Sequence, residues 1–123
     1  MGMTLLVSVV DDDESVRESL PDLIKEFGFA VQAFASAQEY LASDYLDRTH
    51  CLILDVAMPG MSGPDLLKEL WRRGYRIPVI FITALGDASE QAKLRHCGAV
   101  ECLIKPFSEA QLLKALSAAL PLD

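Results

Sequence analysis

One stretch decides the fold of this chain: Cys51-Leu52-Ile53-Leu54-Asp55-Val56-Ala57-Met58-Pro59-Gly60. Its first four residues form an apolar run that is short for a helix and typical of a strand buried on both faces. Pro59 and Gly60 then end the strand. Asp55 is therefore predicted at the carboxyl end of a central strand. A carboxylate gains nothing from that position unless something binds it there, so a binding site is expected at this edge of the sheet.

Length and composition indicate one folded domain over residues 1–123, large enough for one hydrophobic core. Hydrophobic residues make up 51% of the chain and charged residues 24%, as in an ordinary globular protein. The net charge of −7 disfavours direct binding to nucleic acid. No apolar run approaches the roughly 18 residues of a membrane span, and Asp11 interrupts the N-terminal apolar stretch before it could form a signal peptide.

The three cysteines are Cys51, Cys97 and Cys102. Their number is odd, and their spacing fits no zinc-binding pattern. Two of them lie in apolar, strand-like runs. We interpret them as buried thiols in a reducing cytoplasm, with a redox role as the alternative.

Five apolar runs alternate with five amphipathic or capped segments. The runs cover residues 5–10, 29–34, 51–54, 78–83 and 100–104, and the predicted helices cover residues 13–28, 36–46, 62–74, 87–96 and 108–120. Because the runs are continuously apolar, they predict a parallel sheet with helices on both faces. The fold class is a doubly wound α/β, flavodoxin-like (βα)5 sandwich with strand order 2-1-3-4-5.

Details of the helices are also predicted. Pro21 predicts a kink within one continuous helix rather than two helices, since the apolar stripe continues through it. Ser36 with Glu39 predicts a capping box, and Ser108 begins the last helix in the same way. Trp71 is expected to point inward with the leucines of its helix.

Polar residues mark the ends of four predicted strands. They are Asp11 and Asp12 after the first, Asp55 after the third, Thr83 at the end of the fourth, and Lys105 after the fifth. Ligands of doubly wound sheets bind at the carboxyl edge, where the strand order reverses. In the order 2-1-3-4-5 that point lies between the first and third strands, which brings the three aspartates together.

These residue types predict a metal and a phosphoryl group. Three carboxylates in one pocket repel one another, which favours a bound cation. Mg²⁺ fits best, because it takes carboxylate oxygens, waters and a phosphate oxygen, whereas zinc and copper would favour His or Cys. Lys105 adds a positive charge and Thr83 a hydroxyl donor. In-line phosphoryl transfer to an oxygen needs such groups, and Asp55 is the candidate nucleophile.

Each signal also has a plain structural interpretation. An acidic run after a strand is usually a solvated turn or a helix cap, a strand-ending threonine is usually structural, and a Lys-Pro turn is common. Their occurrence together, in this order and at successive strand ends, favours one shared site.

Four motifs carry a resemblance to a known family: VVDDDESVR (9–17), LILDVAMPGMSG (52–63), VIFITA (79–84) and LIKPF (103–107). They resemble the receiver domain of bacterial response regulators, and the resemblance covers essentially the whole chain. DDDESVR, GFAV, MPGMSG and KPF look most like the FixJ-like branch, in which the receiver usually precedes a LuxR-type helix-turn-helix domain. Residues 121–123 are accordingly interpreted as the start of a linker to an output domain, and residues 1–2 as a cloning scar.

By position, the resemblance implies a phosphorylation site. Asp55 would accept a phosphoryl group from the phosphohistidine of a sensor histidine kinase. Asp12 would bind Mg²⁺ directly, Asp11 through water, and Ala57 through its backbone carbonyl, with Asp55 completing the metal site. The chain would be a signalling switch in the bacterial cytoplasm, and not an enzyme with an external substrate.

The resemblance also implies how the phosphoryl group is held and transmitted. Thr83 would hydrogen-bond it, Lys105 would form an ion pair with it, and the Lys105–Pro106 bond would be cis. Phosphorylation would shift an existing equilibrium of the surface formed by the fourth helix, fifth strand and fifth helix. That surface would then form a homodimer or release the DNA-binding output domain.

The sequence departs from the family pattern at two places. The switch position, three residues before the lysine, usually holds Phe or Tyr but here holds Cys102. The coupling from Thr83 to the surface is therefore expected either to be weaker or to use another side chain, such as Phe107. The positions two after Asp55 and two after Thr83 often hold polar groups that influence hydrolytic water, but here hold Ala57 and Leu85. This predicts slow hydrolysis of the phosphoryl group.

Two other functions compete with the switch. A haloacid-dehalogenase-type enzyme also uses a strand-end aspartate and magnesium, but it wants a second acid where this chain has Ala57. A phosphorylation-independent interaction module on the same fold is the alternative that Cys102 leaves open.

Overall fold

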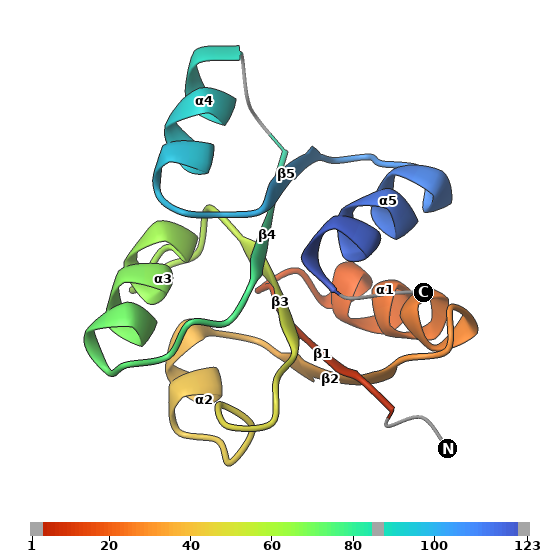
Figure 1. Cartoon of the computed structure of the whole chain (residues 1–123), viewed down its shortest axis with the longest axis horizontal. Coiled ribbons are helices and arrows are strands. Elements are labelled where there is room, and N and C mark those ends of the chain that lie inside the picture. The colour runs from red at the N-terminus through yellow and green to blue at the C-terminus, as the bar shows by residue number, and fades with distance from the viewer. Residues whose placement is uncertain (1–3, 85–87, 121–123) are drawn as a thin grey trace.

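The computed structural model describes residues 4–84 and 88–120, which form a five-stranded parallel sheet between two layers of helices (Figure 1). The sheet order is β2-β1-β3-β4-β5, and every neighbouring pair is parallel. The strands are β1 (Leu6–Val10), β2 (Ala30–Phe34), β3 (Cys51–Asp55), β4 (Val79–Thr83) and β5 (Glu101–Ile104). The helices are α1 (Glu14–Glu26), α2 (Ala37–Leu41), α3 (Gly63–Arg72), α4 (Ala88–His96) and α5 (Glu109–Ala119). The predicted fold class and strand order are confirmed.

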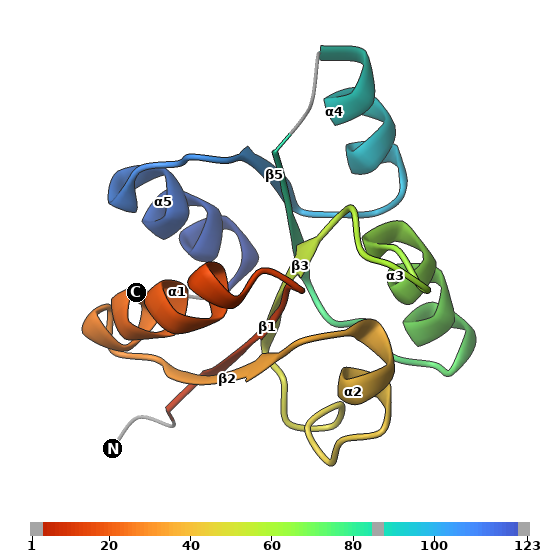
Figure 2. The same cartoon turned by 180° about the vertical axis from the view of Figure 1, so that it is seen from behind.

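The helices divide between the two faces of the sheet. One core cluster joins the sheet to α1 and α5, and the other joins it to α2, α3 and α4, as Figures 1 and 2 show from opposite sides. Every residue of β3 and β4 is buried, which explains why these strands read as continuous apolar runs. The edge strand β2 is more exposed. The central strands therefore form a rigid platform whose carboxyl ends can hold polar groups.

Helix caps agree with the sequence at most boundaries. The side chain of Asp13 caps α1 by accepting from the Ser15 N–H at 2.9 Å, and α1 continues through Pro21 as one helix, as predicted. The predicted capping box of α5 is present between Ser108 and Gln111. At α2 the box is incomplete, because the Glu39 carboxylate accepts from Ala35 N–H instead of from the N-cap residue.

The prediction that the second helix reaches Leu46 is wrong. Helix α2 ends at Leu41, and the following residues form turns. The Ser43 hydroxyl donates to the Tyr40 carbonyl at 2.6 Å and accepts from the Tyr45 N–H at 3.2 Å. A serine that bonds locally to the backbone in this way competes with the helical pattern and ends the helix.

A buried hydroxyl network follows α2 and holds it against the sheet. The Thr49 hydroxyl donates to the Tyr45 carbonyl at 2.7 Å and accepts from the Tyr40 hydroxyl at 2.9 Å. Ser8 lies 2.7 Å from the same oxygen. Since the one Thr49 proton is already used, Ser8 must be the donor of that bond. The Thr49 oxygen therefore joins β1, α2 and the loop before β3.

The prediction that Trp71 points inward is also wrong. Leu66, Leu67 and Leu70 of α3 are buried, whereas Trp71 is 38% exposed. Its ring lies against Gly98, in the turn after α4, and the Arg76 guanidinium stacks over the ring at 5.1 Å. The side chain sits at the margin of the buried stripe and joins α3 to the end of α4.

Some expectations fall outside the described residues: the helix start at Asp87, the side chain of Leu85, the terminal segment 121–123 and residues 1–2. Within the part of the chain that the structure describes, no helix is long and apolar enough to cross a membrane.

Candidate functional site

The site is built at the carboxyl edge of the sheet, where the four neighbouring strands β1, β3, β4 and β5 end side by side. Asp55 is the last residue of β3 and pairs in register with Ile82, one residue before Thr83. The N–H of Lys105 donates to the Thr83 carbonyl at 2.8 Å, which continues the β4–β5 ladder beyond its last paired residues. Each polar side chain is thus fixed by the backbone hydrogen bonds of a buried strand.

Three carboxylates converge at this edge. One oxygen each from Asp11, Asp12 and Asp55 lies within 4.8 Å of the others. Asp11 and Asp55 are buried, and Asp12 is exposed. An all-oxygen set of this kind, open to solvent on one side, suits Mg²⁺, which keeps several of its waters. The structure therefore brings together the three aspartates that the sequence predicts for the metal.

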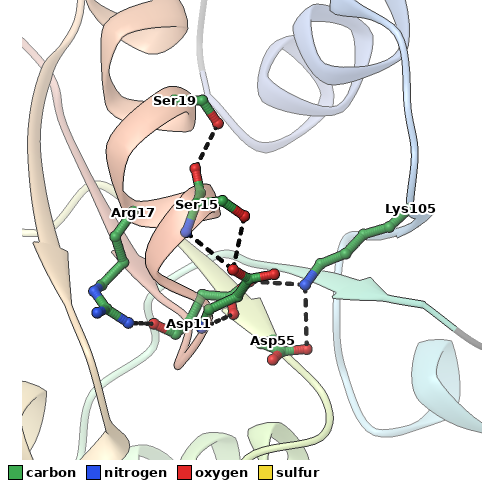
Figure 3. Close-up of polar contacts among 7 residues, drawn as sticks. Asp11, Ser15, Arg17, Ser19, Asp55 and Lys105 are labelled. Carbon is green, nitrogen blue, oxygen red and sulfur yellow. Dashed lines mark hydrogen bonds and ion pairs between the residues drawn. The ribbon is translucent and has the colours of Figure 1, made fainter.

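Asp11 is held by contacts on every side (Figure 3). One carboxylate oxygen accepts from the Asp13 N–H at 2.9 Å, and the other accepts from the Lys105 ammonium at 2.9 Å. Its carbonyl accepts from the Arg17 guanidinium at 2.9 Å. Sequence reasoning missed these roles of Asp13 and Arg17, although both lie in the acidic motif that it singled out. The contacts fix the direction of the Asp11 carboxylate before any ligand binds.

Lys105 reaches across the site from the end of β5. Its ammonium lies 2.9 Å from Asp11 and 3.9 Å from Asp55, and its side chain is 22% exposed. The Lys105–Pro106 bond is cis. Figure 3 shows the lysine pointing from the β5 end towards both carboxylates. Lys105 therefore partly offsets the negative charge that the aspartates gather.

The charge balance nevertheless remains unfavourable for an ionised Asp55. Burial and the negative charge of Asp11 raise the pKa of Asp55 to about 7, against the opposing effect of Lys105. Burial lowers the pKa of Lys105, but the hydrogen bond to Asp11 and the negative charges of Asp11, Asp55 and Asp13 together outweigh burial, so its pKa is raised overall. Lys105 therefore stays charged, whereas the groups around Asp55 supply too little positive charge to favour its ionised carboxylate. A divalent cation would supply that charge.

A cleft of about 360 Å³ opens over Asp55. Its walls include the predicted Asp12, Ala57, Thr83 and Lys105, which therefore face one space. The cleft is also lined by Asp13, Val56, Ala84 and Glu90. Glu90, from the first turn of α4, was missed because the weak periodicity of that helix gives no sign of which side faces the cleft.

Gly63 allows the loop after Asp55 to fold back on the strand. Its N–H donates to the Val56 carbonyl at 3.0 Å. A Cβ at this position would lie 2.5 Å from the Asp55 carbonyl oxygen, closer than side-chain contacts allow. The backbone of α3 can therefore approach Asp55 this closely only with glycine here.

Cys102 stands at the position where the resemblance leads us to expect Phe or Tyr. Cys102 is buried in the cluster on the α2, α3 and α4 face, and burial raises the pKa of its thiol. Phe107 packs against the cluster on the opposite face. Phe107 is therefore not placed to replace the missing aromatic residue on the α4 side of the sheet.

Comparisons with known proteins agree with this geometry. The family model described as response regulator receiver domain matches residues 7–117. Nodulation protein W of Bradyrhizobium diazoefficiens is 47% identical over 118 residues, which are 96% of this chain and 52% of that protein. The transcriptional regulatory protein FixJ of Azorhizobium caulinodans is 44% identical over 121 residues, or 98% and 57% of the two chains. The crystal structure of FixJ-N has a TM-score of 0.84 at 35% identity, covering 96% of this chain and 94% of that one. The chain spans about half the length of these curated relatives.

Proposed function

We propose a function from the premise that this chain belongs to the response regulator receiver domain family: it is a switch phosphorylated on Asp55. Response regulators are signalling proteins, and the predicted resemblance to the FixJ-like branch agrees with the relatives found. One observation carries the proposal. The Asp11, Asp12 and Asp55 carboxylates lie within 4.8 Å of one another. Asp12 and Asp55 border the same cleft as the strand-ending Thr83 and Lys105, whose ammonium lies 3.9 Å from Asp55.

The chemistry assigned to Asp55 is nucleophilic attack on phosphorus. A carboxylate oxygen of Asp55 forms a P–O bond while the P–N bond to the histidine of a sensor kinase breaks, and the leaving imidazole takes up a proton. Lys105 stabilises the transferred charge, as its 3.9 Å approach to Asp55 allows. Thr83 supplies a hydroxyl donor from the neighbouring strand end.

Mg²⁺ is the cofactor that the donor set fits. The side chains of Asp11, Asp12 and Asp55 would hold it together with the carbonyl of Ala57. When bound, it would neutralise charge on the carboxylates and on the phosphoryl oxygens. The 2.9 Å contact between Lys105 and Asp11 keeps the carboxylate of Asp11 directed into the site.

Membership of the receiver domain family suggests partners for this chain, which we include in the proposal. A sensor histidine kinase in the bacterial cytoplasm would be the phosphoryl donor. The surface of α4, β5 and α5 would change on phosphorylation and form a homodimer or release a DNA-binding output domain. Val100, Ile104 and Leu113 are large hydrophobic residues exposed on or beside this surface, which is consistent with a regulated contact. Residues 1–123 would act as the receiver domain, without turnover of an external substrate.

The test is phosphorylation of the chain with acetyl phosphate in Mg²⁺, followed by intact-mass spectrometry. The wild type should gain one phosphoryl group, and the variants Asp55→Asn and Asp55→Ala should gain none. Omission of Mg²⁺ should abolish the reaction. An unmodified wild type under these conditions would instead support the phosphorylation-independent interaction module.

A further inference from the structure

The peptide bond between Asp11 and Asp12 is the point at which the chain leaves the sheet and enters the site. The N–H of Asp11 still donates to the Phe34 carbonyl at 3.1 Å, which continues the ladder between β1 and β2 by one residue. The Asp11 carbonyl accepts instead from the Arg17 guanidinium at 2.9 Å. Asp11 is fully buried, and a buried carbonyl without a partner is costly. Arg17 therefore satisfies the first backbone carbonyl after the strand.

Arg17 reaches this carbonyl from the first turn of α1. Asp13 caps the helix by accepting from the Ser15 N–H at 2.9 Å, and the Asp13 carbonyl accepts from the Arg17 N–H at 3.1 Å. The residue that donates to Asp11 is thus itself fixed by the start of the helix. A cation in the first turn gains nothing from the helix dipole, which favours acidic residues there. We therefore assign the contribution of Arg17 to its contact with the loop.

This contact determines the direction of Asp12. Because a peptide bond is planar, a hydrogen bond that holds the Asp11 carbonyl also orients the N–H and the Cα of Asp12. Asp12 is exposed, unlike Asp11 and Asp55, so packing restrains its side chain least. One oxygen of its carboxylate nevertheless lies within 4.8 Å of an oxygen from each of the other two aspartates. The orientation of this one peptide thus sets whether the third carboxylate faces the metal site.

Arg17 and Lys105 act on different parts of Asp11. Figure 3 shows them reaching it from opposite sides, Arg17 from α1 and Lys105 from the end of β5. The Lys105 ammonium contacts the carboxylate at 2.9 Å, whereas the Arg17 guanidinium contacts the backbone. Lys105 lines the cleft over Asp55, and Arg17 is not part of that lining. Arg17 therefore acts through the Asp11–Asp12 peptide and not by touching a ligand in the cleft.

We propose that Arg17 is a positioning residue of the Mg²⁺ site, because its hydrogen bond to the Asp11 carbonyl holds Asp12 towards Asp55. The inference rests on the proposed function, in which these aspartates hold Mg²⁺, and it places a determinant of metal affinity on α1, outside the ligand set. Partners that orient metal ligands typically change metal affinity by roughly 10- to 100-fold. The lower end of that range is expected, since Arg17 is only partly buried.

The sign of the effect separates positioning from simple electrostatics. Arg17 carries a positive charge near a site for a cation, so on charge alone its removal would strengthen Mg²⁺ binding. Loss of the hydrogen bond would weaken that binding. Arg17→Met removes both the charge and the donor, and it keeps an unbranched side chain of similar helix propensity. Arg17→Lys keeps the charge and one donor group, so it should recover part of the affinity.

The experiment is a titration of this chain with Mg²⁺, followed by heteronuclear NMR through the backbone amides of residues 11–13. It compares the wild type with Arg17→Met and Arg17→Lys, and the same spectra report whether each variant is folded. Lys25→Met is the matched control, because Lys25 is an exposed cation in the last turn of the same helix. Phosphorylation by acetyl phosphate is then measured at increasing Mg²⁺ concentration.

We expect Arg17→Met to bind Mg²⁺ about tenfold more weakly than the wild type, and Arg17→Lys to lie between them. Lys25→Met should bind as the wild type does. Phosphorylation of Arg17→Met should need about tenfold more Mg²⁺ for its half-maximal rate, with a change of less than about twofold in the rate at saturating Mg²⁺. This split would not arise from a loss of stability alone.

Equal or tighter Mg²⁺ binding by Arg17→Met would refute the positioning role, even if the variant were less stable in urea. No recovery of affinity in Arg17→Lys would also count against it. If the wild type binds no Mg²⁺, the metal site of the proposed function is refuted, and this inference fails with it. If the wild type binds Mg²⁺ but is not phosphorylated, the proposed function fails, while the Mg²⁺ affinities still decide the role of Arg17.

Discussion

The unfavourable charge of Asp55 predicts that removal of its charge stabilises the resting protein. Burial and Asp11 raise the pKa of Asp55 from 3.8 to about 7 in the folded chain. The stability that the carboxyl contributes is therefore fully present below pH 3.8 and is lost as the pH rises through about 7. Above that pH the ionised carboxylate destabilises the fold, so Asp55→Asn should be more stable than the wild type near pH 8.

The size of the effect follows from the same shift. A change from 3.8 to about 7 corresponds to about 4 kcal/mol if the environment does not relax. Water in the open cleft screens the charge, which reduces the expected gain to about 1–2 kcal/mol. For a domain of this size that is a melting temperature higher by about 4–8 °C. At about pH 5.5 the gain should fall to roughly half, since Asp55 is then largely protonated in the folded state.

The assay is urea denaturation of the wild type and Asp55→Asn at about pH 5.5 and pH 8, in EDTA and in Mg²⁺. Mg²⁺ should stabilise the wild type and reduce the advantage of the variant, because the cation neutralises the carboxylates. Asp22→Asn, an exposed aspartate of α1, is the control for the loss of a charge. A variant no more stable than the wild type at pH 8 in EDTA would refute the charge balance described for the site.

Other substitutions test the surrounding structure. Thr49→Val removes the oxygen that joins the buried hydroxyl network and should cost about 1–3 kcal/mol in urea denaturation. Gly63→Ala should push α3 away from the Asp55 carbonyl, and a loss of about 1–3 kcal/mol in the same assay would be accompanied by weaker Mg²⁺ binding in a fluorescence titration. Lys105→Gln should leave the fold intact by circular dichroism but slow phosphorylation by acetyl phosphate at least tenfold. Ala57→Asn should shorten the lifetime of phosphorylated chain in a phosphate-decay assay, since a polar group there could orient water.

The fold and the strand-end site could be predicted because both depend on strong local signals. Buried parallel strands need continuous apolar runs, and a polar residue placed directly after such a run must lie at the edge of the sheet. Asp55 and Thr83 are of this kind. Their meeting in space follows from the strand order alone, without knowledge of any side-chain contact.

The errors arose where tertiary contacts outweigh local pattern. Ser43 ends α2 early through two hydrogen bonds that apolar periodicity does not reveal. Trp71 has the spacing of a core residue, yet its ring packs on Gly98, which is distant in the sequence. The sequence pattern around Glu90 predicts an ordinary solvated side chain, and its place in the lining of the cleft depends on how α4 packs.

The surroundings of Asp55 disfavour its ionised carboxylate, so the electrostatic balance of the site responds to bound ligands. The Asp11 carboxylate is fully buried and accepts hydrogen bonds from the Asp13 N–H and the Lys105 ammonium. Asp55 lies beside Asp11, but the Lys105 ammonium is 3.9 Å from Asp55 and 2.9 Å from Asp11. The negative charge of Asp55 is therefore offset less fully than that of Asp11. Binding of a cation and transfer of a phosphoryl group both change this imbalance, and Glu90 shares the cleft in which it changes.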